Sequence, residues 1–116
     1  MTANADTHMS ANMKQCLENC SDCHDVCLTT VAHCLQMGGK HVDAAHMTLL
    51  LDCAQICDTS ADAMRRHSAQ SATICRACAD ICRACAESCD KVGMTDCAAA
   101  CRKCEKSCTS MAGMKM

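Results

Sequence analysis

The sequence contains no Phe, Tyr or Trp and no Pro. Without aromatic rings the chain lacks the stacking platforms on which proteins that bind single-stranded nucleic acids hold the bases. The formal net charge of −2 also provides no basic surface for a phosphate backbone or an anionic membrane. The composition therefore predicts neither nucleic acid nor a membrane surface as a partner.

Long apolar runs are absent as well, and no segment approaches the roughly 18 apolar residues of a membrane span. Residues 1–8 lack the basic stretch followed by an apolar run that marks a secretory signal. We therefore expect a cytoplasmic protein, in which thiols stay mostly reduced. A length of 116 residues predicts a single domain over residues 1–116, with flexible termini.

Cysteine is the residue that the chain has in excess, with 16 copies. Twelve of them form one pattern, Cys-x3-Cys-x2-Cys-x3-Cys, that occurs three times. Alternating steps of four and three residues return a side chain to the same face of an α-helix, so each copy places four thiols along one helical stripe. The three copies are Cys16/Cys20/Cys23/Cys27, Cys78/Cys82/Cys85/Cys89 and Cys97/Cys101/Cys104/Cys108.

The same periodicity divides the chain into helices. Gly38-Gly39 and Gly93 each follow a periodic stretch and predict helix ends, and the phase of the stripe slips between Arg66 and Ser71. No stretch alternates with period two, so the fold class is all-α. Short connections favour antiparallel neighbours, and we predict an up-down-up-down four-helix bundle. The predicted helices span about 10–37, 41–67, 69–91 and 95–111.

The core of this bundle is expected to be lined by cysteine. The remaining four, Cys34, Cys53, Cys57 and Cys75, also fall on the predicted inward stripes. Protonated thiols pack as small apolar groups, so the bundle can fold empty. Methionines continue the inward stripe of the first helix at its two ends, at Met9, Met13 and Met37.

Other uses of so many cysteines stay open at this point. Disulfides would have to connect different helices, because neighbours within one helix do not readily reach disulfide torsions. An iron–sulfur protein would carry spacings such as Cys-x2-Cys-x2-Cys-x3-Cys-Pro, which this chain lacks. A thiol redox enzyme or sensor needs an exposed cysteine of low pKa at a helix start. Cys75 and Cys97 lie nearest to helix starts, but both are on the inward stripe.

Soft-metal binding remains the leading interpretation, and geometry and charge favour Cu(I). Zinc prefers closed tetrahedral sites on turns, whereas a helical row presents pairs of thiolates that suit two-coordinate Cu(I). A zinc tetrathiolate carries a charge of −2, and several in one dry core would be costly. One Cu(I) per thiolate leaves the core neutral, which predicts a capacity of about 16 ions with bridging thiolates and about half with unshared pairs.

A copper entrance is expected where His and Met residues gather. The end formed by the first and third connections should bring together Met37, His41, His46, Met47 and Met94, and we favour it because it combines these side chains with the Gly38-Gly39 loop. The opposite end should gather Met9, Met13, Met64, His67 and Met111, and Met114 and Met116 follow in the C-terminal tail.

From about Met9 to Met111 the chain resembles the bacterial copper storage protein family, on the strength of the repeated thiol pattern along a helical seam. The resemblance implies a four-helix bundle whose inward thiols hold many Cu(I) ions, an opening lined by His and Met, and a homotetramer. It implies the 16 cysteines as core ligands and Met37, His41, His46 and Met47 as the entrance, with His33 nearby. The chain is similar to the cytosolic branch, and Leu50 stands where a further thiol would continue the repeat.

Overall fold

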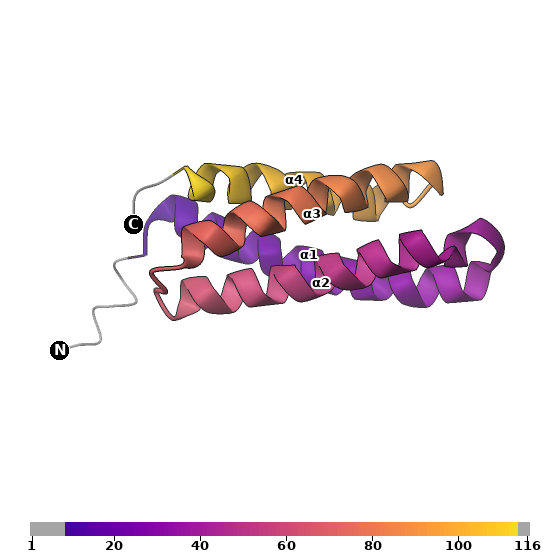
Figure 1. Ribbon diagram of the computed structural model, residues 1–116, viewed down its shortest axis with the longest axis horizontal. Helices are drawn as coiled ribbons and strands as arrows, with labels where there is room; N and C mark the ends of the chain where they lie inside the picture. The colour runs from indigo at the N-terminus through magenta and orange to yellow at the C-terminus, as the bar shows by residue number, and fades with distance from the viewer. Residues whose placement is uncertain (1–8, 114–116) are drawn as a thin grey trace.

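The computed structural model describes residues 9–113, which form an antiparallel four-helix bundle (Figure 1). No strand is present within these residues, so the predicted all-α fold class is confirmed. The bundle is elongated, with principal extents of 54 × 24 × 18 Å. The four α-helices and one short 3-10 helix are α1 (Ala11–Met37), η2 (Gly39–Val42), α2 (Ala44–Arg65), α3 (Ser71–Lys91) and α4 (Thr95–Ala112).

Local chemistry explains where the first helix begins and ends. The Ser10 hydroxyl accepts a hydrogen bond of 3.0 Å from the Met13 backbone N–H and so caps the start of α1. At the other end, Gly38 has φ = 70°, and its N–H donates to the Cys34 carbonyl. Glycine adopts this left-handed conformation without the steric cost that a Cβ would bring, so the chain can turn there into η2.

The connections differ slightly from the predicted boundaries. α2 begins at Ala44, a few residues later than expected, because residues 39–42 form the tighter turn η2. Residues 66–70 connect α2 to α3, and His67 in this connection has φ = 54°. The Ser71 hydroxyl donates a bond of 2.8 Å to the Ser68 carbonyl at the start of α3. The η2 turn and the α3–α4 connection lie at one end of the bundle, and the α2–α3 connection lies at the other (Figure 1).

The core consists mainly of cysteine side chains. All 16 cysteines are buried, and Leu50, Met64 and Met111 are the large side chains that are fully buried with them. Small side chains such as Ala54 and Ala86 fill the space between the helices. Because the core has no aromatic residue, its apolar burial comes from groups that are each small but close-packed.

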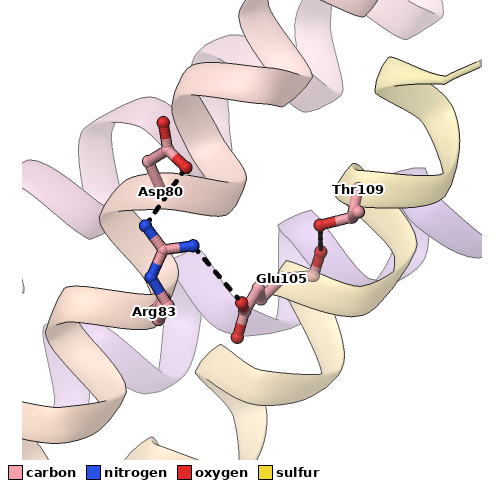
Figure 2. A network of polar contacts seen from close by, with 4 residues as sticks. All are labelled: Asp80, Arg83, Glu105 and Thr109. Carbon is pink, nitrogen blue, oxygen red and sulfur yellow. Dashed lines mark hydrogen bonds and ion pairs between the residues drawn. The ribbon is translucent and has the colours of Figure 1, made fainter.

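Ion pairs across the surface connect α3 and α4. Arg83 lies 3.3 Å from Asp80 in its own helix and 3.8 Å from Glu105 in α4, and Figure 2 shows this arrangement. Arg102 of α4 pairs with Asp90 of α3, which holds the pKa of that carboxyl below its usual range. Exposed pairs of this kind contribute little to the stability of the fold. Burial of the cysteine core therefore makes the largest contribution to that stability.

Among residues 9–113, no helix has both the length and the apolar character needed to cross a bilayer. Met114 and Met116 of the C-terminal tail, and the segment 1–8, lie outside the described residues.

Candidate metal centre

The 16 cysteine side chains form a column along the bundle axis, which we call the thiol column. Sulfur atoms from different helices approach one another within about van der Waals distance: Cys57 Sγ lies 3.7 Å from both Cys78 and Cys82 of α3 and 3.8 Å from Cys104 of α4. At these distances, far from the ~2.05 Å of a disulfide, the thiols are unbonded neighbours. Every cysteine of the chain is a free thiol.

The column is built from groups of four thiols whose sulfur atoms all lie within 4.8 Å of one another. Consecutive groups share two members, so the groups join edge to edge along the axis. Five of them, from the α2–α3 end to the η2 end, are Cys20/Cys78/Cys104/Cys108, Cys57/Cys78/Cys82/Cys104, Cys23/Cys53/Cys57/Cys82, Cys23/Cys27/Cys53/Cys101 and Cys27/Cys85/Cys97/Cys101.

This arrangement determines what the column can coordinate. A thiol that belongs to two groups, such as Cys57 or Cys23, can bridge two metal ions. Soft thiolate donors at this spacing select Cu(I) or another thiophilic ion over hard cations. Bridging also limits the charge, because one monovalent ion per thiolate leaves the dry core neutral.

The protonation state of the column follows from contacts between thiols. Hydrogen bonds from Cys101 and Cys27 lower the pKa of the Cys97 thiol below its ordinary value. The hydrogen bond with Cys104, together with burial, raises the pKa of Cys57 well above its ordinary value. A thiol that accepts an S–H bond is easier to deprotonate and one that donates is harder, so proton loss is distributed unevenly along the column.

At the η2 end, Cys34 contacts an imidazole. Its sulfur lies 3.5 Å from Nε2 of His46, and Nδ1 of His46 lies 2.7 Å from the hydroxyl oxygen of Ser88. We assign the tautomer in which Nδ1–H donates to Ser88, because Nε2 then presents its lone pair to Cys34. His46 is 3 % exposed, and burial raises the pKa of the Cys34 thiol. A nitrogen and a sulfur atom that can both coordinate a metal therefore face each other at a buried position.

The other residues expected at this end are placed less uniformly. Met47 and Met94 pack against the core, and His41 is half-buried in η2. Met37 is 54 % exposed, so the expectation that it faces inward is wrong. The reason is that α1 ends at Met37, and the following turn at Gly38 leaves no helix packed over that side chain.

Three methionines close the opposite end of the column. Met13, Met64 and Met111 are buried there on α1, α2 and α4, whereas His67 is exposed. Ser60 precedes Met64 by one turn on the inward face of α2, and its buried hydroxyl has no hydrogen-bond partner among residues 9–113. Cys53, Cys57, Ser60 and Met64 follow the four-three-four spacing of the thiol repeat, so Ser60 stands at the position of a third thiol.

Two polar residues near the column were not expected from the sequence. Ser88 orients His46, and Asn19 is buried on α1 with its amide nitrogen 3.2 Å from the Ser107 hydroxyl. Asn19 precedes Cys20 and Ser88 precedes Cys89, so both lie beside the thiol stripe rather than on it. Stripe periodicity cannot find such residues, because their partners are on other helices.

Comparison with known proteins places this geometry among related structures. A family model described as copper storage protein matches residues 9–113. The protein Nmul_A1745 from Nitrosospira multiformis is 44 % identical, with a TM-score of 0.85 over 87 % of this chain and 94 % of that one. No curated protein sequence matches.

Two further solved structures contain copper. The Cu(I)-bound copper storage protein BsCsp3 is 35 % identical, with a TM-score of 0.82 over 88 % of this chain and 99 % of that one. A cytosolic copper storage protein from Streptomyces lividans, with five coppers, is 29 % identical, with a TM-score of 0.79 over 89 % of this chain and 93 % of that one.

Proposed function

The chain belongs to the copper storage protein family, and we propose on that premise that it stores Cu(I) on the thiolates of its core. The observation that carries this proposal is the edge-sharing series of four-thiol groups, in which neighbouring groups share two sulfurs. An isolated metal site needs one such group. A continuous series has a use only if many ions bind side by side, which is the property of a store.

We assign the 16 cysteines as the copper ligands. Each is buried and free, and sulfur neighbours at 3.6–4.0 Å connect α1, α2, α3 and α4 along the axis. Copper uptake replaces S–H protons, so the empty core holds neutral thiols and the filled core holds neutral copper–thiolate units. The helices therefore do not depend on the metal for their charge balance.

The η2 end supplies the most direct support for an entrance lined by His and Met. His46 adds a nitrogen donor beside Cys34, and Met47 packs against the core one residue later. We assign His41 and Met37 to the outer part of this entrance, where His41 is half-buried and Met37 is exposed. Exposed thioether and imidazole groups suit the transfer of copper into the core. They bind Cu(I) weakly and therefore pass it readily to the thiolates.

Storage rather than catalysis is the role that the burial of the thiols supports. A redox enzyme requires a thiolate that a partner can reach, and all 16 sulfurs here lie inside the bundle. We place the protein in the cytoplasm, because free thiols persist there. The similar protein from Streptomyces lividans is described as cytosolic, which supports this placement. For the assembly we propose a homotetramer, and the exposed side chains of Leu28, Leu35 and Leu51 support association through α1 and α2.

An anaerobic titration of the reduced protein with Cu(I), against a competing chelator and with far-UV circular dichroism in parallel, tests the proposal. We expect tight uptake of many ions per chain and a helical signal that is already present before copper is added. An endpoint near one ion per thiol would indicate bridging thiolates, and about half that value would indicate separate pairs. Saturation at one or two ions would contradict storage and favour a redox or chaperone role.

A further inference from the structure

In one of the four-thiol groups the sulfur atoms lie near the corners of a regular tetrahedron. The sulfur of Cys57 lies 3.7 Å from those of Cys78 and Cys82. It lies 3.8 Å from that of Cys104, and Cys78 and Cys82 are themselves 3.8 Å apart. Four of the six edges are therefore nearly equal, and the two from Cys104 to α3 are within 4.8 Å. We call these four residues the central group.

These separations are the ones that a tetrahedral zinc ion requires. A Zn–S bond is about 2.3 Å long, which corresponds to an S···S edge of about 3.8 Å in a tetrahedron of four sulfur ligands. Close packing alone brings two sulfur atoms to this distance. Four sulfurs that are all mutual neighbours also enclose one point. An ion at that point lies close to bonding distance from each sulfur, with little movement of the helices.

The neighbouring groups have less equal edges. Toward the α2–α3 end, Cys20 lies 3.6 Å from both Cys104 and Cys108, whereas Cys104 and Cys108 are 4.0 Å apart. Toward the η2 end, the sulfur of Cys23 lies 3.9 Å from Cys53 and 4.0 Å from Cys27. The central group therefore matches the zinc tetrahedron better than the groups on either side.

Three helices build the central group. Cys57 comes from α2, Cys78 and Cys82 are one turn apart on α3, and Cys104 comes from α4. A row of thiols along a single helix cannot surround an ion with four ligands, and this is why the sequence favours Cu(I) over zinc. Packing of the helices removes that restriction, because it brings thiols from three directions to one point.

The charge of a zinc tetrathiolate limits how many such sites the column can hold. Each carries −2, which is costly to bury unless hydrogen bonds stabilise the thiolates. Protonated thiols nearby can donate them: Cys53 lies 3.7 Å from Cys82, and Cys20 lies 3.6 Å from Cys104. A second site next to the first would add a further −2 and compete for the two shared sulfurs. We therefore expect one tightly bound divalent ion per chain.

We propose that the central group, when free of copper, binds one Zn(II) or another divalent ion of the same tetrahedral, thiophilic class. The zinc site does not depend on copper storage, although it uses thiols of the proposed store. If the store operates, Cu(I) displaces the zinc, because four Cu(I) ions neutralise four thiolates and one Zn(II) does not. In that exchange four Zn–S bonds break, bridged Cu–S bonds form and Zn(II) leaves. No metal changes its oxidation state.

Titration of the reduced apo protein with Co(II) under anaerobic conditions tests the geometry, because Co(II) occupies zinc sites and its visible spectrum reports the coordination. We expect the intense absorption of a tetrahedral tetrathiolate, saturating at one ion per chain and abolished by one equivalent of Zn(II). The weak spectrum of six-coordinate cobalt, or saturation at several ions, would overturn the proposed site.

Substitution locates the site within the column. Cys57→Ala removes one member of the central group, and Cys97→Ala is the matched control because it removes a buried thiol from a different four-thiol group. Zinc affinity is measured in competition with a coloured chelator, and far-UV circular dichroism confirms that both variants are folded. We expect Cys57→Ala to bind zinc about 100-fold more weakly, since loss of a group that only orients a ligand already costs 10- to 100-fold. The control should bind zinc like the wild type. Equal weakening in both variants, or in neither, would contradict the assignment.

Copper titration of the zinc-loaded protein separates this inference from the proposed function. We expect Zn(II) to appear in solution, detected by a zinc indicator, as Cu(I) is taken up. Zinc that stays bound while copper fills the column would overturn the assignment, because the central group cannot hold both. A copper endpoint of one or two ions would overturn storage and leave the tetrahedral cobalt spectrum as independent support for the zinc site.

Discussion

Nε2 of His46 lies 3.5 Å from the sulfur of Cys34, at the η2 end of the thiol column. The second ring nitrogen lies 2.7 Å from Ser88, which determines how the imidazole is held. The pair supplies one nitrogen and one sulfur donor from α2 and α1, in contrast to the all-sulfur groups along the rest of the axis. Substitutions can separate the contribution of the Cys34–His46 pair to copper binding from the contribution of the all-sulfur groups.

Replacing His46 by Leu should lower the Cu(I) capacity by about one ion, because Cys34 loses its partner donor. Replacing Ser88 by Ala should keep the capacity but weaken binding of that ion by roughly 10- to 100-fold, since the imidazole is no longer oriented. Competitive titration against a chelator measures both effects. His24→Ala is the matched control, because His24 contacts the Ala54 carbonyl and no thiol. Equal capacities for His46→Leu and the wild type would exclude a site at Cys34.

Ser60 offers a substitution that should stabilise the protein. Its buried hydroxyl has no partner among residues 9–113, and an unsatisfied polar group costs about 1–3 kcal/mol. Ser60→Cys and Ser60→Ala should therefore both raise the free energy of unfolding of the apo protein, by about 1 kcal/mol. Chemical denaturation under reducing conditions measures the change.

Copper capacity distinguishes the two Ser60 variants. Cysteine at this position would add a third thiol to the row begun by Cys53 and Cys57, so only Ser60→Cys should bind additional Cu(I). Destabilisation in both variants would mean that the Ser60 hydroxyl forms a bond in solution after all.

Bridging predicts that thiols in the middle of the column matter more than those at its end. Cys57 belongs to two of the four-thiol groups, and its sulfur has neighbours on both α3 and α4. Cys57→Ala should lower the capacity by about two ions, whereas Cys34→Ala should lower it by about one at most. Counting bound copper by mass spectrometry under native conditions checks this. Equal losses from the two variants would favour isolated pairs over a bridged array.

The raised pKa of Cys34 gives the apo protein a specific pH dependence. Because burial raises this pKa in the folded state, the stability that the protonated thiol contributes is fully present below the unfolded value of 9.0. It is lost as pH rises from there through the folded pKa. The melting temperature of the wild type, relative to Cys34→Ala, should therefore be higher at pH 7 than at pH 10. A difference that grows with pH would mean that Cys34 is held as a thiolate.

Much of the bundle could be predicted from the spacing of one residue type. The four-three steps of Cys97, Cys101, Cys104 and Cys108 identify a helix and its buried face together, because only helical periodicity returns them to one stripe. Gly38 and Gly93 indicated the turns correctly, and both have positive φ. The same reasoning failed at Met37, since a stripe continued to the last residue of a helix does not show whether a neighbour still covers it.

The amino-acid sequence by itself determined the helices, their thiol faces and the preference for a soft monovalent metal, because periodicity and donor chemistry are local properties of the chain. Only the tertiary structure decided which thiols lie within bridging distance, since Cys57 and Cys104 are 47 residues apart and meet through packing. It also decided that His46 is held by Ser88 and that Ser60 has no partner among residues 9–113. Each of these depends on the rotation and axial offset of one helix against another, which result from close packing of all four helices.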